Sequence, residues 1–349
     1  MIVAFSALRF FNALMIFCHH KNSIDNPYLV AFGPCAVSFF LMLSGFVMCY
    51  GYKEKVLAPD FSYKKFLFKR FARLYPLHLL CLFLWLGLNI KSVVSCGEGQ
   101  ILSIICNLFL VQSWIPKQTV YFSGNAVSWC LSDLFFFYAV FPFVIRLLQK
   151  KNRVISFSVI YFVLYGILLP LIPKDYVHAF VYINPLFRFS DFYIGVLLYK
   201  LYTTTKDKLE NKNMLGIVFQ VLSVLITGIA IFVYKYVPEC LHFQALFFIP
   251  SAMLVLSFAL FDKNVFSKLL SVKLFNYLGE ISFTFYMLHT LGIAFVGLVI
   301  SHLGLEINFI YKSFLQFAFV LIGSAVVHKF YEKPAANKFL MVFDRKYDS

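Results

Sequence analysis

The sequence predicts an all-α integral membrane protein with about ten transmembrane helices. Three observations predict it. Of the 349 residues, 61% are hydrophobic and only 13% are charged, the mean hydropathy is +0.80, and apolar runs near 20 residues recur from end to end. Soluble globular chains are nearer half apolar and a quarter charged, whereas about 20 apolar residues form a membrane-spanning helix. We expect a single membrane-embedded domain over residues 1–349.

Basic residues in the connections between apolar runs orient the chain. The net charge is +15, which in a soluble protein would favour nucleic acid. Here Lys and Arg gather in short connections such as 52–73, as the positive-inside rule describes, so we expect a lipid bilayer and no nucleic acid as partner. Both termini are then cytoplasmic. The predicted spans are about 2–20, 29–51, 74–91, 127–148, 154–173, 182–202, 214–234, 241–261, 276–300 and 310–331.

The apolar run 100–114 does not fit this alternation. It lies between two points that are predicted outside, and it is shorter than the roughly 17 residues that a span needs. If it crossed the membrane, every later basic connection would be moved outside. We therefore expect a short re-entrant or interfacial helix here.

The eight cysteines predict no metal site, because none forms a C-x-x-C pair or another ligand spacing. Most lie in apolar runs, where cysteine behaves as a small hydrophobic residue. Cys96 and Cys240 fall in connections predicted outside, so they either form a disulfide or remain free. The P-loop, the G-x-S-x-G elbow and the H-E-x-x-H motif are absent.

The first apolar run, residues 8–20 with the sequence LRFFNALMIFCHH, carries ionisable groups. Arg9 and His20 are eleven residues apart, about three turns plus 20°, so they share one helix face roughly 16 Å apart along the axis. Such groups are costly in a membrane unless they line a polar path. His20 is therefore a candidate general base, the alternative being an interfacial histidine. Arg9 either joins that path or anchors to lipid phosphates. His19 points about 100° away and is the weaker candidate.

A second basic segment, residues 64–76, reads KKFLFKRFARLYP. Arg70 and Arg73 are spaced i, i+3, so they are neighbours on a helix. Two guanidinium groups repel each other unless an anion lies between them, and this geometry suits a bidentate phosphate. The alternative is an ordinary positive-inside cluster. Pro76, which marks a helix start or a kink, favours the binding site.

Other polar groups lie within apolar runs. Arg188 and Asp191 are spaced i, i+3 and are expected to form a structural ion pair. Glu280 and His289 are nine residues apart, on roughly opposite faces of one helix, so they are not partners. His289 is either a functional intramembrane group or part of a hydrogen bond between helices.

Several motifs, taken in order, resemble those of the acyltransferase-3 family of polytopic membrane acyltransferases. They are LRFFNALMIFCHH, FFLMLSGFVM, KRFARLYPLHLL, SWCLSDLFFFYAVFP, LFRFSDFYIGVLL, LGEISFTFYMLH and the closing YEKP. Arg9 and His20 match the family's motif of a basic residue, ten further residues and a histidine, which selects His20 over His19. Arg70 and Arg73 match its Arg-x-x-Arg motif. The chain departs from the family after Ser132, where Leu134 replaces the usual glutamate and Asp133 precedes it by one position.

The resemblance implies a multi-pass O-acyltransferase of the plasma membrane, without a metal. It would move an acyl group, usually acetyl from acetyl-CoA, to a hydroxyl of a cell-surface or lipid-linked glycan. Arg70 and Arg73 would bind the phosphates of acyl-CoA. His20 would activate the acceptor hydroxyl or carry the acyl group, and Arg9 would contact the pantetheine arm or stabilise the oxyanion. A flippase or exporter of a lipid-linked saccharide is the alternative, because buried Arg, Asp and His suit transport as well.

Overall fold

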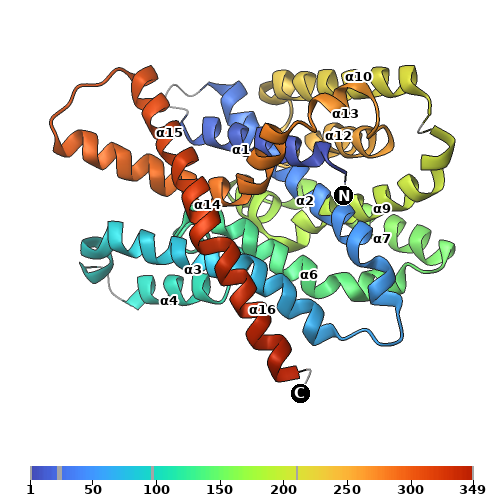
Figure 1. The fold of residues 1–349 in the computed structure, drawn as a ribbon, viewed down its shortest axis with the longest axis horizontal. Helices are drawn as coiled ribbons and strands as arrows, with labels where there is room; N and C mark the ends of the chain where they lie inside the picture. Colours follow the sequence, from blue (N-terminus) through green and yellow to red (C-terminus); the bar gives the residue numbers. More distant parts are fainter. Residues whose placement is uncertain (1, 22–25, 96–97, 210, 348–349) are drawn as a thin grey trace. The chain divides into compact units, whose positions relative to one another are not determined.

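The computed structural model describes residues 2–21, 26–95, 98–209 and 211–347, and this part of the chain contains helices and no strands (Figure 1). The long helices are α1 Ala4–His20, α2 Pro27–Leu57, α3 Tyr63–Ser95, α6 Trp129–Leu147, α7 Lys151–Leu168, α9 Pro185–Leu209, α10 Asn213–Val233, α12 Phe248–Leu260, α14 Lys273–His302, α15 Phe309–Val327 and α16 Lys333–Tyr347. The short α-helices are α4 Glu98–Leu108, α5 Gln118–Tyr121, α8 Lys174–Val177, α11 Glu239–His242 and α13 Val265–Leu269. Two π-helical segments, His178–Ile183 and His328–Glu332, precede α9 and α16.

The all-helical prediction is confirmed. Among the described residues, 7 helices are long and apolar enough to cross a membrane. Each of the ten predicted spans overlaps a helix, but three of these helices fall outside that set: α1, α9 and α12. α1 has 17 residues and α12 has 13, so at 1.5 Å per residue both are shorter than a hydrocarbon core of about 30 Å. The number of spans, and the side on which each terminus lies, stay predictions.

The connection between the second and third apolar runs is shorter than predicted. We expected a basic loop over 52–73, yet α2 continues to Leu57 and α3 begins at Tyr63. Pro59 explains the break, because a proline disfavours the helical conformation of the preceding residue, and Ala58 is extended with ψ 146°. Pro76 does not begin the helix: it lies inside α3, and the non-helical backbone comes later, at Asn89.

The run 100–114 forms a short helix, as expected from its length. α4 spans Glu98–Leu108, 11 residues, and ends before Leu110, which has a positive φ of 53°. The hydroxyl of Tyr75 donates to the carbonyl of Leu108 at 2.9 Å, and a ring nitrogen of His78 lies 2.9 Å from the carbonyl of Asn107. The C-terminal end of α4 is therefore tied to α3. Its re-entrant or interfacial placement stays a prediction.

The chain divides into two compact units. Unit 1 contains residues 1–63 and 136–279, and unit 2 contains residues 64–135 and 280–349. In unit 1, α2 packs against α1, α9 and α12. A Cβ added to Gly45 of α2 would overlap the carbonyl oxygen of Phe192, and one added to Gly195 of α9 would overlap that of Met42. Glycine at both positions lets the two backbones touch, which is how membrane helices pack closely.

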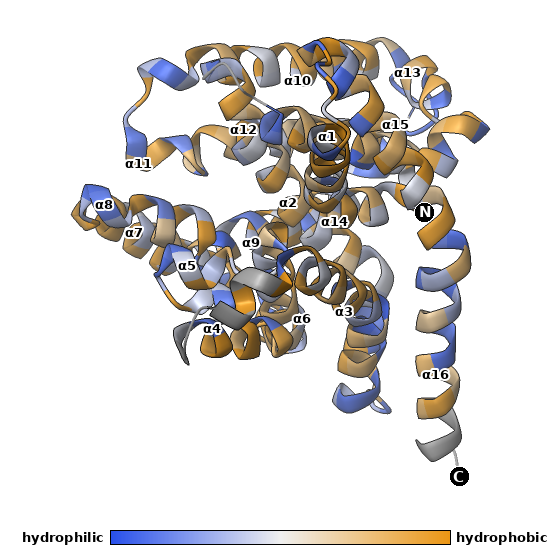
Figure 2. Ribbon diagram, turned by 90° about the vertical axis from the view of Figure 1, so that its left-hand side faces the viewer, coloured by the Kyte–Doolittle hydropathy of each residue, from blue (hydrophilic) through white to orange (hydrophobic). Residues whose placement is uncertain are grey.

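Unit 2 is held together by hydrogen bonds from α14 to the connection that precedes α6. The amide of Asn125 donates to the carbonyl of Met287 at 2.8 Å, and the hydroxyl of Tyr286 donates to the carbonyl of Val127 at 2.9 Å. At the C-terminal end, hydrophilic and hydrophobic residues alternate along α16 (Figure 2). One apolar residue of α16, Phe343, stacks on Phe68 of α3 with ring centroids 4.0 Å apart.

Candidate functional site

α1 carries the first pair of candidate residues on one continuous helix. No glycine or proline interrupts Ala4–His20, so the predicted helical relation between Arg9 and His20 holds. Eleven residues at 1.5 Å each separate them by about 16 Å along the axis. The Arg9 side chain is half-buried, and its Nη2 donates to Ser6 Oγ at 3.3 Å. Because side chains tilt toward the N-terminus of their helix, the guanidinium of Arg9 points away from His20.

His20 is the last residue of α1, and its side chain is exposed. Its Nδ1 lies 3.0 Å from the carbonyl oxygen of Ile16. A carbonyl oxygen can only accept, so Nδ1 carries the hydrogen in this bond and Nε2 of the neutral ring carries the lone pair. This tautomer is the one that a general base acting through Nε2 requires.

His19 has a different environment from its neighbour. Its Nδ1 lies 3.2 Å from the carbonyl of Leu29, and its ring covers Gly33, where an added Cβ would come within 3.0 Å of the ring. Both contacts are made with α2. His19 therefore links α1 to α2.

The N-terminal half of α3 is fixed through an aromatic face. Phe71 stacks on Tyr75 with ring centroids 4.2 Å apart, Phe68 stacks on Phe343 of α16, and Tyr75 bonds to the end of α4. Positions 68, 71 and 75 share one side of a helix because they are three or four residues apart. This side of α3 is thus occupied by contacts inside unit 2.

The Arg70–Arg73 pair lies on the opposite half of α3, together with Lys69. The prediction that the two arginines are neighbours on a helix is confirmed, since both lie well inside α3. Arg70 is half-buried and Arg73 is exposed, and within the described ranges Arg73 forms no ion pair. Two positive charges are therefore held side by side on a rigid element, an arrangement that suits a phosphate.

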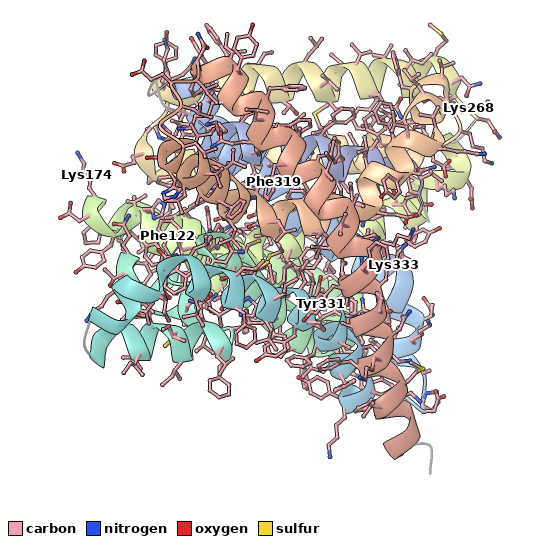
Figure 3. The ribbon with its side chains drawn as sticks, turned by 60° about the vertical axis from the view of Figure 1, so that its left-hand side comes forward. Phe122, Lys174, Lys268, Phe319, Tyr331 and Lys333 are labelled. Atoms are coloured by element: carbon pink, nitrogen blue, oxygen red, sulfur yellow. The ribbon has the colours of Figure 1, made fainter. Side chains whose placement is uncertain are left out.

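Tyr331 supports this helix from the C-terminal part of unit 2. It belongs to the π-helical segment His328–Glu332, and its hydroxyl donates to the carbonyl of Pro76 at 3.1 Å, one turn after Arg73 (Figure 3). Pro76 and Tyr331, the first residue of the YEKP motif, are therefore in contact, although the sequence alone predicts no link between them. They are 255 residues apart, and no spacing rule relates such distant positions.

Comparisons with known proteins identify the family. A family model described as an acyltransferase domain, that of the acyltransferase-3 family, matches residues 2–328. The chain belongs to this family. The acyltransferase MdmB of Streptomyces mycarofaciens is 29% identical over 318 residues, which cover 83% of this chain and 78% of that protein. ORF330 of Acidianus two-tailed virus, whose name describes it as a candidate acetyltransferase, is 25% identical over 307 residues, 86% of each chain. No solved structure matches.

The acyltransferase also contains a buried ion pair, as predicted. Arg188 Nη1 lies 3.2 Å from Asp191 Oδ2, and both side chains are 0% exposed. The same Nη1 donates to the carbonyl of Phe243 at 3.0 Å, and Gln244 donates to Asp191 at 2.9 Å. Hydrogen bonds between α9 and the 243–244 segment thus involve both members of the pair. The pair therefore links two segments of unit 1.

The other polar candidates of the acyltransferase are bound within unit 2. Glu280 pairs with Lys333 at 3.0 Å, which agrees with the expectation that His289 is not its partner. His289 is fully buried, and its Nδ1 lies 2.6 Å from the carbonyl of Tyr286 on its own helix. Asp133 is fully buried in α6.

Of the two cysteines predicted either to form a disulfide or to remain free, the structure describes only Cys240. Cys240 is a half-buried free cysteine, and Cys96 lies outside the described residues. No group of three or more potential metal ligands occurs in the described part of the acyltransferase.

Proposed function

We propose that this acyltransferase is a multi-pass O-acyltransferase of the plasma membrane that moves an acetyl group from acetyl-CoA to a hydroxyl of a cell-surface or lipid-linked glycan. One observation carries the proposal: in a chain of this family, His20 presents the lone pair of Nε2 at the exposed end of α1 while Nδ1 is bonded to Ile16. The acetyl donor is supported by the name of the viral relative. The acceptor class rests on the family resemblance.

His20 has the role of general base in this proposal. Nε2 takes the proton of the acceptor hydroxyl as the oxygen attacks the thioester carbonyl. The carbon–sulfur bond then breaks, the acetyl group stays on the acceptor oxygen, and the departing thiolate recovers the proton from the imidazolium. In the alternative form of the step, Nε2 attacks the carbonyl itself and CoA leaves as the thiolate. The acetyl-imidazolium then transfers its acetyl group to the acceptor oxygen, and the thiolate takes up the proton of the acceptor hydroxyl. The bond to Ile16 stabilises the required tautomer in either case.

Arg70 and Arg73 have the role of binding the donor phosphates. A guanidinium group offers two parallel N–H donors to a phosphate and stays charged at every physiological pH. The aromatic face of α3 and the Tyr331 bond fix the helix on which the pair sits. The positions of the two cations are therefore set before the donor arrives, which lowers the entropic cost of binding.

Arg9 is assigned to the arm of the donor rather than to the reacting carbonyl. The rise of about 16 Å along α1 is longer than an arginine side chain, and the Arg9 side chain points away from His20. A guanidinium at this position can donate to the amide carbonyls of a pantetheine arm. We therefore prefer this role to stabilisation of the oxyanion.

The decisive experiment measures release of CoA thiol from radiolabelled acetyl-CoA by the full chain, purified and reconstituted in lipid nanodiscs. The proposal predicts turnover that rises when a membrane extract containing lipid-linked glycans is added, with the label recovered on an ester that mild base cleaves. A folded protein that neither binds nor cleaves acetyl-CoA would overturn the proposal. Movement of a lipid-linked saccharide without thioester cleavage would then identify a flippase or exporter.

A further inference from the structure

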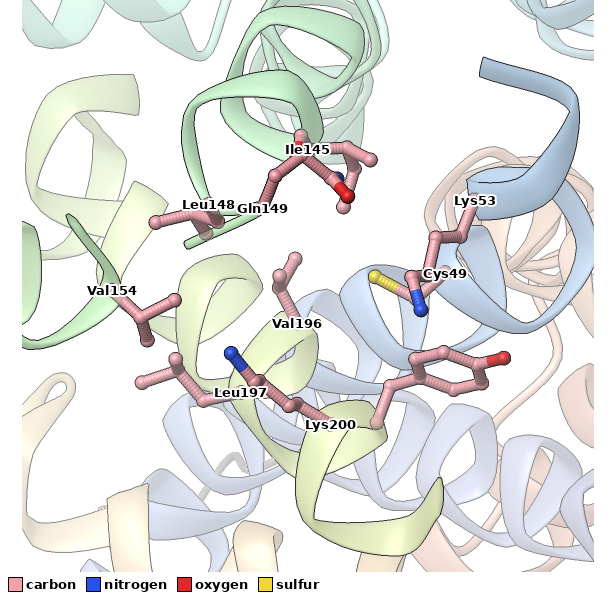
Figure 4. A pocket seen from close by; sticks show the side chains of 10 residues that line it. Cys49, Lys53, Ile145, Leu148, Gln149, Val154, Val196, Leu197 and Lys200 are labelled. Atoms are coloured by element: carbon pink, nitrogen blue, oxygen red, sulfur yellow. The ribbon is translucent and has the colours of Figure 1, made fainter. Parts of the chain in front are cut away.

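Unit 1 contains a cavity that the proposed reaction does not use. Its volume is about 120 Å³, and it is lined by side chains from α2, from the C-terminal end of α6 and the residues after it, from α7 and from α9 (Figure 4). Basic residues lie near the C-terminal end of α2 and around the connection from α6 to α7, among them Lys53, Lys55, Lys150 and Lys151. By the positive-inside rule these helix ends lie on the cytoplasmic side.

Two lysines provide the charge of this cavity. Lys53 of α2 and Lys200 of α9 both line it, and no carboxylate does. Lys53 Nζ lies 5.9 Å from the centre of the Tyr199 ring, and its ion pair with Glu54 is 3.5 Å long. Glu54 is 82% exposed, so water screens that contact. Among the residues that the structure describes, Lys200 forms no ion pair.

The remaining wall is largely apolar. It consists of the side chains of Ile145, Leu148, Val154, Val196 and Leu197. The lining therefore has two positive charges and no negative charge. A bound anion would supply the missing counter-charge, and a hydrocarbon chain attached to the anion would cover the apolar wall.

We propose that the Lys53–Lys200 cavity binds the phosphate group of a phosphate ester. The two ammonium groups hold the phosphate as point charges, a role for which lysine is suited. Either the headgroup of an anionic lipid or a soluble phosphate ester can supply this group. Neither Arg70 nor Arg73 is among the residues that line the cavity, and the proposal does not depend on the acyltransferase reaction.

Native mass spectrometry of the full chain tests the site. The protein is transferred from mixed micelles that contain either phosphatidylglycerol or phosphatidylcholine, and the lipids retained are counted. We expect preferential retention of phosphatidylglycerol. An interfacial lysine contributes about 1 kcal/mol toward an anionic lipid, so the Lys53→Gln/Lys200→Gln variant should lose roughly thirtyfold of that preference. Lys55→Gln/Lys206→Gln, which removes two nearby cations outside the cavity, should keep it.

A second arm tests the soluble source with pyrophosphate, by thermal stabilisation of the protein in phosphatidylcholine nanodiscs. Lysine-dependent stabilisation by pyrophosphate, without a lipid preference, would support the same site with a soluble ligand. The proposal is overturned if the Lys53→Gln/Lys200→Gln variant matches wild type in both arms. Should this variant fail to fold, Lys200→Gln alone decides, since Lys200 is exposed and should lose about fivefold.

Discussion

Arg188 and Asp191 in α9 share their i, i+3 spacing with Arg70 and Arg73 in α3, but the two pairs have opposite surroundings. The α9 pair is 0% exposed, oppositely charged, and bonded to Phe243 and Gln244. The α3 pair is like-charged and accessible, and its helix is held by contacts made on the other face. A buried charge without a partner would cost several kcal/mol, and in the α9 pair each charged group is the counter-charge of the other. Arg73 of the α3 pair is exposed, and we propose that a bound anion supplies the counter-charge of this pair.

His19 and His20 also differ in their surroundings, one in contact with a second helix and the other exposed. The Nδ1 of His19 is bonded to Leu29 of α2 and its ring covers Gly33, whereas the Nδ1 of His20 is bonded to Ile16 of its own helix and the His20 side chain is exposed. The comparison teaches that polar groups bonded from several sides stabilise the fold. We propose that an exposed group such as His20 is the one available to substrate.

The largest effect is expected for His20→Ala. Removal of a general base typically costs 10² to 10⁴ in rate, so kcat should fall by about that factor while unfolding stability is nearly unchanged. His19→Asn is the matched control, which should keep kcat within about threefold and lower stability by about 1 kcal/mol. Added imidazole should restore part of the activity of His20→Ala. Wild-type kcat in that variant would remove His20 from the mechanism.

The next effect concerns stability rather than catalysis. Asp191→Asn leaves the guanidinium of Arg188 buried without its counter-charge, and such a change costs about 3–5 kcal/mol. Thermal unfolding in detergent should show the loss, while the KM for acetyl-CoA should not change. Asp207→Asn, an exposed acid near the end of the same helix, should have no effect. If Asp191→Asn were as stable as wild type, the pair would not hold unit 1 together.

Substitution of the α3 pair should change the KM for acetyl-CoA and leave the unfolding stability nearly unchanged. Arg70→Ala and Arg73→Ala should each raise the KM for acetyl-CoA about tenfold, since a charged hydrogen bond contributes about 1.5 kcal/mol or more. Arg73→Lys should lie between, because it keeps the charge but loses the bidentate geometry. Lys64→Ala, at an exposed cation on the same helix, is the control. A KM that no arginine variant changes would make the pair an ordinary positive-inside cluster.

The smallest effect is expected for Tyr331→Phe, which removes only the hydroxyl that donates to Pro76. The net contribution of one hydrogen bond to stability is about 1 kcal/mol. If Tyr331 positions the α3 pair, the KM for acetyl-CoA should rise about fivefold with kcat unchanged. Tyr311→Phe, at a tyrosine that is 70% exposed, should change neither. A loss of stability with an unchanged KM would limit Tyr331 to a structural role.

The sequence was sufficient for features that depend on local periodicity. The helical relation of Arg9 to His20, that of Arg70 to Arg73, the Arg188–Asp191 pair and the short run near residue 100 all follow from spacing along one helix. The loop over 52–73 was predicted wrongly, because basic residues were taken to end a helix that only Pro59 ends. The Tyr331–Pro76 bond and the contacts of His19 with Leu29 and Gly33 join different helical segments, and no local pattern specifies them.

One measurement tests the division of roles between His20 and the α3 pair. Equilibrium binding of radiolabelled CoA and steady-state turnover of acetyl-CoA are measured on the same preparations of wild type, His20→Ala and Arg70→Ala/Arg73→Ala. We predict that His20→Ala binds CoA as wild type does but turns over at least a hundredfold more slowly. The arginine variant should bind about a hundredfold more weakly yet approach the wild-type kcat at saturating donor. Weakened CoA binding in His20→Ala, or wild-type binding in the arginine variant, would contradict the assignment.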